Sequence, residues 1–252
     1  MKPKHFIIAL ILLICGTINA QNAHFWDGIE AFDGPTDENP VLSAQIDFYF
    51  DKLVAPLPDS ITLEISRLIE RTSDNHDLRD FILWHLLEKY RHPIYMSQDQ
   101  VFVFLYDQYF SQLEINDLNE VNRTLIQEKA DRLRRLALFQ PAPSFKINDS
   151  IDLQTIENKY TVLFFYDHDC DLCHEEMQDL DSVCAAHPEI TVLAIDMNTD
   201  DVRFNILYDL YDIETTPLIY VLDRDKRIIA KKIRARQIEL VIETSLDFGV
   251  RK

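Results

Sequence analysis

Glycine and cysteine are scarce in this chain: its 252 residues include four of each. So few glycines argue against long flexible linkers and against the glycine-rich loops that cradle phosphate groups. Four cysteines are too few for the disulfide framework that stabilises a small secreted domain. Basic residues are also in the minority, because 25 lysines and arginines face 43 acids and leave a formal net charge of −18. A chain this acidic is not expected to bind nucleic acid or an anionic membrane surface.

An uninterrupted apolar run of ten residues, 6–15, follows two lysines near the N terminus. The run is too short to span a bilayer, and its flanks favour an export signal over a buried N-terminal helix. Ile14 precedes Cys15 where a lipoprotein signal requires a small residue, so a lipid anchor is not expected. We predict that residues 1–20 are a signal peptide and that the exported protein is periplasmic, with no stable membrane span.

Residues 21–140 carry the apolar period of helices and no catalytic constellation. Five helices are expected, beginning near Asn39-Pro40, Pro58-Asp59, Asn75, Gln98 and Asn119. Asn39 and Pro40 suit the cap and the first turn of a helix. The aromatic stripes of this half could line a groove, but helix core is the favoured interpretation. We therefore predict an all-α N-terminal domain whose role the sequence does not assign.

Two prolines, Pro141 and Pro143, cannot continue the last of these helices, so we place a domain boundary after residue 140. Beyond it, segments of strand and helix alternate. Strands are expected at Tyr160–Tyr166, Ile190–Ile195, Leu218–Leu222 and Arg227–Lys232. Helices are expected after each of the first two strands and near the C terminus. This order predicts that residues 141–252 form an α/β domain with a central sheet and helices on both faces.

The first of these strands leads to a C-x-x-C pair, Cys170 and Cys173, at the start of a helix. The spacing lets the two sulfurs bond, and a helix N terminus stabilises a thiolate on the first cysteine. A redox-active disulfide between the two would need no further cofactor. Cys184 lies 11 residues beyond Cys173 (184 minus 173) without such a partner. It is expected to be a buried small side chain that the chemistry does not need.

Other interpretations of this stretch remain open. The pair is followed by His174, which completes the C-x-x-C-H pattern of haem c attachment. The acidic flanks and the preceding apolar strand do not favour a haem. A zinc or copper site is a second alternative, with Cys170, Cys173, His174 and His168 as its ligands. A purely structural disulfide is a third. We expect no metal, and favour thiol–disulfide chemistry.

The element order, with C-x-x-C after the first core strand and Thr215–Pro217 before the final hairpin, resembles the thioredoxin fold. The segment Ala142–Phe145 is similar to the opening of the exported TlpA/ResA-like branch. The helical half also resembles that of two-domain proteins common in Bacteroidetes, whose N-terminal domain has no assigned function. The resemblance implies a thioredoxin-like thiol–disulfide oxidoreductase. It also implies a cis peptide before Pro217 and a backbone at Thr216 that pairs with the substrate chain.

The resemblance assigns roles to individual side chains. Cys170 would attack a cysteine or disulfide of a client protein, and Cys173 would resolve the mixed disulfide. Glu176 matches an acidic residue near the active site and is a candidate for proton transfer. An upstream membrane or periplasmic thiol donor would supply electrons. The chain departs from the pattern where Phe164 replaces a buried aspartate of thioredoxin and where Lys226 replaces a hairpin glycine.

Acidic side chains surround the cysteine pair in the sequence: Asp167, Asp169, Asp171, Glu175 and Glu176. They repel a thiolate and so oppose the helix N terminus, whereas protonated His168 and His174 would partly restore its effect. This balance favours a reducing or isomerising role over an oxidising one. The alternative from another class is a binding protein, in which the helical half captures a ligand or partner and the cysteine pair is structural or binds metal.

Overall fold

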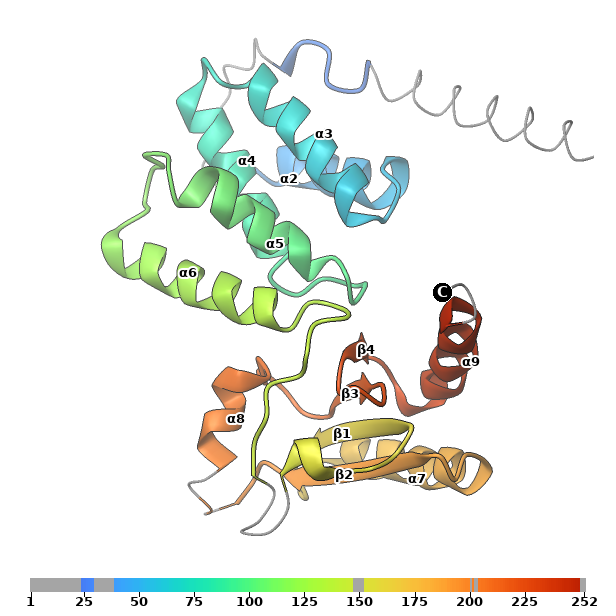
Figure 1. The fold of residues 1–252 in the computed structure, drawn as a ribbon. Helices are drawn as coiled ribbons and strands as arrows, with labels where there is room; N and C mark the ends of the chain where they lie inside the picture. The colour runs from blue at the N-terminus through green and yellow to red at the C-terminus, as the bar shows by residue number, and fades with distance from the viewer. Residues whose placement is uncertain (1–23, 30–38, 147–151, 200, 202–203, 250–252) are drawn as a thin grey trace, which may run out of the picture. The chain divides into compact units, whose positions relative to one another are not determined.

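The computed structural model describes residues 24–29, 39–146, 152–199, 201 and 204–249 (Figure 1). The predicted signal peptide, residues 1–20, lies outside these residues. Within the described ranges, no helix is long and apolar enough to cross a membrane. The chain divides into two compact units, Met1–Asn119 and Glu120–Lys252.

The first unit is helical, as predicted. Its helices are α2 (Pro40–Phe48), α3 (Pro58–Arg71), α4 (His76–Lys89) and α5 (Asp99–Leu105), and α2 and α5 run on into the π-helical turns η2 (Tyr49–Leu53) and η3 (Tyr106–Phe110). Asn39 caps α2 by accepting a hydrogen bond from the Leu42 amide at 3.0 Å. Asn75 caps α4 in the same way, from the Leu78 amide at 3.1 Å. Side-chain caps therefore set two of the helix starts that the sequence predicts.

The core of this unit is built from side chains at helical spacing. Fully buried members include Ile46, Ile61, Ile65, Leu68, Ile82 and Leu86. Among the aromatic residues, Tyr49, Phe102 and Phe110 are buried with them, whereas Phe48 is 52% exposed. The favoured interpretation of the aromatic stripes as helix core is therefore confirmed for these three. Burying one such side chain stabilises the fold by about 1.5–3 kcal/mol.

The second unit is a mixed sheet with flanking helices, in the predicted order. Its elements are α6 (Glu120–Arg135), η4 (Leu153–Thr155), β1 (Tyr160–Tyr166), α7 (Asp171–Ala186), β2 (Ile190–Asp196), α8 (Asn205–Leu210), β3 (Leu218–Leu222), β4 (Ile228–Lys231), η6 (Ala235–Gln237) and α9 (Ile238–Gly249). The strand order is β2-β1-β3-β4. Strand β1 pairs parallel to β2 and antiparallel to β3, and β3 pairs antiparallel to β4.

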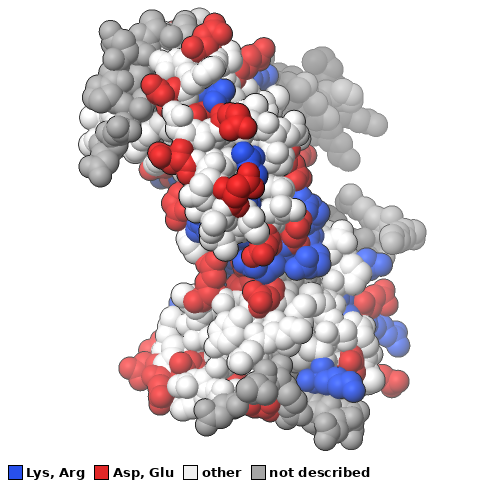
Figure 2. Space-filling view, turned by 90° about the vertical axis from the view of Figure 1, so that its left-hand side faces the viewer, with Lys and Arg blue, Asp and Glu red and all other residues white. Residues whose placement is uncertain are grey.

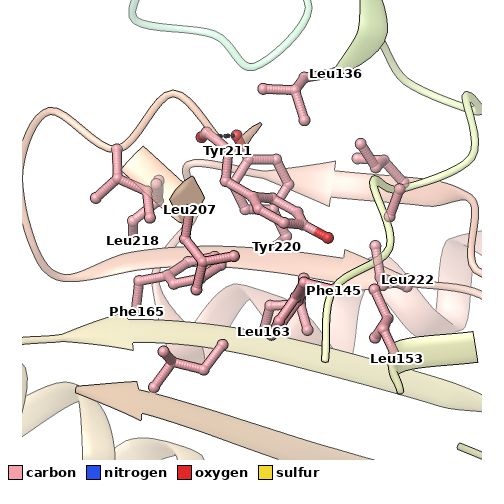
Figure 3. Close-up of a cluster of buried hydrophobic side chains, with 14 of the residues drawn as sticks. Leu136, Phe145, Leu153, Leu163, Phe165, Leu207, Tyr211, Leu218, Tyr220 and Leu222 are labelled. Atoms are coloured by element: carbon pink, nitrogen blue, oxygen red, sulfur yellow. Dashed lines mark hydrogen bonds between the residues drawn. The ribbon is translucent and has the colours of Figure 1, made fainter. Parts of the chain in front are cut away.

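Both faces of this sheet are buried. On one face, Leu163 and Phe165 of β1 belong to a cluster with Leu207 and Tyr211 of the α8 region (Figure 3). The rings of Phe165 and Tyr211 lie 5.1 Å apart. Alternate residues of a strand point to opposite faces, and Phe164 between them is also fully buried. Strand β1 therefore reads as a continuous apolar run because it is covered on both sides.

The compact units divide after Asn119, so α6 groups with the sheet unit, and the domain boundary after residue 140 stays a prediction. Helix α6 ends at Arg135, before the two prolines, and the chain that follows stays bound to the sheet. The Phe139 amide donates to the Ile228 carbonyl at 2.7 Å, and the Ile228 amide donates to the Gln140 carbonyl at 3.0 Å. The segment after α6 therefore pairs along β4, and Lys231 of β4 donates to the Leu136 carbonyl.

Acidic side chains are spread over both units on the face that Figure 2 shows. Lysine and arginine side chains are fewer there, in keeping with the net charge of −18. Neither unit presents the broad basic surface that a nucleic-acid backbone would require on this face.

Candidate functional site

Cys170 caps the N terminus of α7. Its backbone is extended (φ −100°, ψ 114°), and its sulfur accepts a hydrogen bond from the Cys173 amide at 3.2 Å. Strand β1 ends four residues before Cys170, so the buried strand delivers the thiol to the first turn of the helix. Unpaired amides and the helix dipole favour an anion at this place. Cys170 is partly exposed, and Leu172 beside it is 40% exposed.

Cys173 lies beneath Cys170 and is completely buried. Burial raises the pKa of its thiol, whereas hydrogen bonds from the Asp167 backbone and the Thr216 side chain act in the opposite direction. Cys170 and Cys173 are both free thiols in this structure. The pair therefore combines one accessible sulfur with one sheltered sulfur, which is the arrangement that attack and resolution require.

The peptide bond between Thr216 and Pro217 is cis, as the resemblance implied. The sheet register explains why this bond lies near the thiols. Leu218, the first residue of β3, pairs with Phe165 near the end of antiparallel β1. The loop that enters β3 and the loop that leaves β1 therefore meet at one edge of the sheet, where Thr216 reaches Cys173.

Glu176 is buried on α7, with 1% of its surface exposed. Its carboxylate accepts hydrogen bonds from the Arg234 guanidinium and, at 2.6 Å, from the Ala235 amide. These contacts fasten α7 to the segment before α9. Both carboxylate oxygens are thus occupied by donors away from the cysteines, so the geometry favours a positioning role. Proton transfer by Glu176 stays a prediction.

A polar clamp holds the loop before Cys170 to the end of β2. Asn198 donates to Asp167 at 3.1 Å and to Asp169 at 3.2 Å. His168 Nδ1 lies 2.7 Å from an oxygen of Asp196, and this hydrogen bond raises the pKa of the imidazole. The Asp169 amide and Asn198 lower the pKa of Asp167. Asp196 and Asn198 were not predicted from the sequence, although the parallel strands β1 and β2 end at the same edge of the sheet.

The alternative interpretations can be compared with this geometry. Among the described residues, no group of three or more histidine, cysteine, aspartate or glutamate side chains is placed to hold a metal ion. His174 points into solvent rather than into an apolar envelope, because its side chain is exposed. Cys184 is half-buried and not fully buried as expected. Burial, with a smaller contribution from Asp181, raises the pKa of its thiol.

The two departures from the thioredoxin pattern have structural counterparts. Phe164 is fully buried and stacks on Tyr166 with ring centroids 5.5 Å apart, so an apolar ring occupies the place of the aspartate. Lys226 adopts the left-handed backbone of the glycine that it replaces (φ 58°). Its buried ammonium group donates to the Thr161 hydroxyl at 3.0 Å, and burial lowers its pKa.

Comparison with known proteins supports the fold. Residues 138–237 match the AhpC/TSA family. No curated protein matches the chain. A thioredoxin-like protein from Bacteroides caccae is 16% identical with a TM-score of 0.67, over 88% of this chain and 90% of that one.

Two shorter solved structures are also similar to parts of the chain. A domain of a possible thiol-disulfide isomerase from Cytophaga hutchinsonii is 25% identical with a TM-score of 0.40, over 46% of this chain and 98% of that one. A thiol:disulfide interchange protein from Bacteroides sp. is 19% identical with a TM-score of 0.38, over 43% and 90%.

The C-terminal unit is therefore a thioredoxin-like domain. More narrowly, residues 138–237 of this unit match the AhpC/TSA family, and a substantial helical region precedes them. The matched range begins close to the point where the chain leaves α6 and joins the sheet.

Proposed function

We propose that the protein is a thiol–disulfide oxidoreductase that exchanges electrons with the cysteines of client proteins through Cys170 and Cys173. The observation that carries this proposal is the helix cap at Cys170. An accessible sulfur there accepts the Cys173 amide at 3.2 Å and lies over a completely buried second sulfur. The loop that enters β3 supports the same proposal. It contains the cis peptide before Pro217, and its Thr216 side chain is hydrogen-bonded to Cys173.

In the reducing direction, the Cys170 thiolate attacks one sulfur of a client disulfide. A mixed disulfide forms, and the other client sulfur leaves as a thiolate that takes up a proton. Cys173 then loses its proton and attacks the Cys170 sulfur, which releases the second client sulfur. Two electrons have passed to the client, and the Cys170–Cys173 disulfide has formed. A thiol donor must reduce this disulfide to complete the cycle, and we assign that step to a membrane or periplasmic donor.

The charges around the site support a reducing or isomerising direction. Asp169, Asp171 and Glu175 are exposed around the helix start, and Asp167 has a lowered pKa and stays ionised. Negative charge close to the sulfurs destabilises a thiolate, so it favours the disulfide over the dithiol and makes the pair a better electron donor. His168 offsets part of this charge when it is protonated.

We infer a periplasmic location from the sequence pattern of residues 1–20. This location agrees with a reducing or isomerising activity, because cysteines of client proteins in an oxidising compartment form disulfides that need reduction or rearrangement.

A redox titration tests the proposal. The protein without residues 1–20 is equilibrated with mixtures of reduced and oxidised dithiothreitol, and the oxidised fraction of the pair is measured by thiol alkylation and mass. We expect one two-electron transition confined to Cys170 and Cys173. Reduction of insulin disulfides, followed by turbidity, then separates an exchange enzyme from a binding protein. The absence of a transition, or a stoichiometric metal or haem in the purified protein, overturns the proposal.

A further inference from the structure

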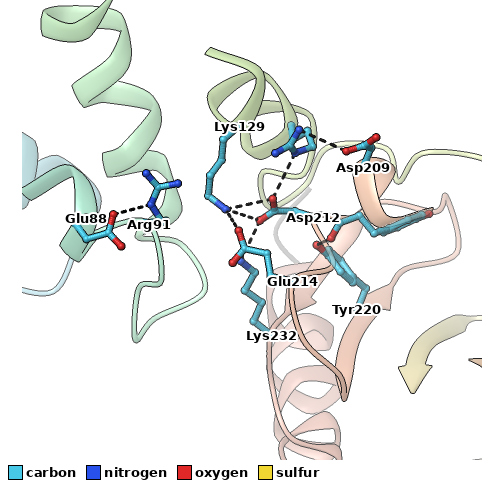
Figure 4. A network of polar contacts seen from close by, with 10 residues as sticks. Glu88, Arg91, Lys129, Asp209, Asp212, Glu214, Tyr220 and Lys232 are labelled. Atoms are coloured by element: carbon cyan, nitrogen blue, oxygen red, sulfur yellow. Dashed lines mark hydrogen bonds and ion pairs between the residues drawn. The ribbon is translucent and has the colours of Figure 1, made fainter. Parts of the chain in front are cut away.

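A buried ion cluster in the C-terminal unit lies two residues before the cis peptide, and it takes no part in the proposed electron transfer. Lys129 of α6 is its centre, with 3% of its side chain exposed. Its ammonium group lies 3.3 Å from each oxygen of Asp212 and 2.5 Å from an oxygen of Glu214 (Figure 4). A buried charge persists only when it is paired, so these two carboxylates explain why a lysine is tolerated there.

Asp212 is the buried anion of this cluster. Besides Lys129, it faces Arg132 at 3.5 Å and Lys232 at 3.4 Å. Its backbone is left-handed (φ 50°), a conformation that aspartate adopts more readily than most residues. The neighbouring Tyr211 is held by its own carbonyl, which accepts the Tyr220 hydroxyl at 2.7 Å. The start of the loop after α8 is therefore fixed by charge and by hydrogen bonding.

Glu214 connects this cluster to the thiols. It is partly exposed and pairs with Lys129, and Thr216 follows two residues later. Two residues of chain span at most about 7 Å, so Glu214 and Thr216 must lie close together. Thr216 in turn donates its side-chain hydrogen bond to Cys173 and precedes the cis bond. A continuous path therefore runs from α6 to the buried thiol.

We propose that Lys129 is a positioning residue for the redox site: by holding Asp212 and Glu214, it fixes the loop that presents Thr216 and Pro217 beside Cys173. This role belongs to a helix that the sequence groups with the N-terminal domain. The inference rests on the proposed function, because it concerns the same pair of cysteines.

The test compares two buried lysines. Lys129→Met removes the ion pairs with the loop. Lys231→Met is the matched control, because Lys231 is equally buried and donates to the Leu136 carbonyl just after α6. Lys129→Arg keeps the charge. Each variant is measured for urea unfolding, for its dithiol–disulfide equilibrium with dithiothreitol, and for KM and kcat in insulin reduction.

We expect Lys129→Met to shift the equilibrium about threefold or more toward the disulfide, because the Thr216 hydrogen bond that stabilises a reduced Cys173 is loosened. The KM for insulin should rise more than kcat falls. Lys129→Arg should recover most of the shift, and Lys231→Met should lose stability with the equilibrium changed less than twofold. Equal effects of the two methionine variants overturn this inference alone. No redox transition in the unaltered protein overturns the proposed function and this inference with it.

Discussion

Two buried carboxylates, one in each unit, accept the same kinds of hydrogen bond but stabilise different parts of the protein. Asp80 of α4 accepts the Arg79 guanidinium at 2.8 Å on one oxygen and the Asn116 amide at 2.8 Å on the other. Glu176 of α7 also accepts one guanidinium, from Arg234, and one backbone amide, from Ala235. Asp80 secures a turn of the helical unit, whereas Glu176 secures the helix that carries the two cysteines.

The comparison shows that the same polar contact can serve stability alone or stability together with chemistry. A buried acid bound to a backbone amide replaces the hydrogen bonds that the chain would otherwise make to water. In the helical unit we find no reactive group near such a contact among the described residues. In the sheet unit, the contacts of Glu176, Asn198 and Lys129 all lie on segments that lead to the cysteine pair.

The largest effect is expected from the cysteines themselves. Cys170→Ser should reduce insulin reduction to the uncatalysed rate, because no thiolate remains at the helix cap. Cys173→Ser should leave Cys170 able to attack and should trap a mixed disulfide, detectable as a stable adduct in non-reducing gels. Cys184→Ala is the matched control and should retain the full rate, since Cys184 has no partner at C-x-x-C spacing. A large loss of rate in Cys184→Ala would show that it takes part in the electron transfer.

The next largest effect, on the stability of the fold, is expected from the two buried carboxylates Glu176 and Asp80. Glu176→Gln and Asp80→Asn each replace a buried acceptor by an amide and should each destabilise the protein by about 1–3 kcal/mol in urea unfolding. Arg234 is more exposed than Arg79 (58% against 13% of the side chain), which reduces the contribution of the ion pair at Glu176.

Only Glu176→Gln should also change the chemistry, by about three- to tenfold in the rate of insulin reduction, because it loosens α7. Asp80→Asn should unfold more easily and reduce insulin at the normal rate. If the two variants lose activity equally at a temperature where both are folded, Glu176 has no specific connection to the site. If Glu176→Gln instead removes a basic or acidic limb from the pH profile of kcat, proton transfer is supported.

Much of the sheet unit could be predicted from the sequence because its signals are local. The apolar runs of β1 and β3 and the C-x-x-C pair are contiguous in the chain, so each defines an element or a site without knowledge of the fold. The contacts that hold the site are not local. Lys129 and Asp212 are 83 residues apart, and His168 and Asp196 are 28 apart. The pairing of β1 with β2 brings His168 to Asp196, and the packing of α6 in the sheet unit brings Lys129 to Asp212.

The grouping of α6 with the sheet unit shows the same limit. Helix α6 ends at Arg135, before Pro141 and Pro143. A helix end is a local event, whereas a domain boundary depends on where the chain next forms contacts. Here the chain pairs at once with β4, and α6 carries a buried lysine whose partners lie after α8. A charged residue at a buried helix position, such as Lys129, is the one local signal that could have indicated a second packing partner.

Neutralising the exposed acids near the thiols should have a smaller effect. Asp169→Asn with Asp171→Asn removes two negative charges beside the helix cap, so the dithiothreitol equilibrium should shift about three- to tenfold toward the dithiol. The matched control is Asp59→Asn with Asp74→Asn, two exposed acids of the helical unit, which changes the net charge equally and should leave the equilibrium unchanged. Equal shifts in both double variants would indicate a general effect of net charge and not a local one.

The smallest effect is expected from His168. Its pKa is raised above the ordinary 6.5, first by the hydrogen bond to Asp196 and then by the surrounding carboxylates. The protonated imidazole is therefore fully present at a pH below its ordinary value and is lost as the pH rises through the raised value. As that charge disappears, the acids near the sulfurs are less well offset, and the equilibrium with dithiothreitol should move further toward the disulfide.

This change in the equilibrium constant as the pH rises through the pKa of His168 is the step to be measured. Because the side chain is about half exposed, the step should be only about twofold. His168→Gln, which can still donate a hydrogen bond to Asp196 but cannot titrate, should remove the step and leave the rest of the pH profile unchanged. His76→Gln, an exposed histidine of the helical unit, is the control and should keep the step. A step that persists in His168→Gln would assign it to another group. In either case the clamp between Asn198 and Asp167 would still hold the loop, because neither of those side chains titrates in this range.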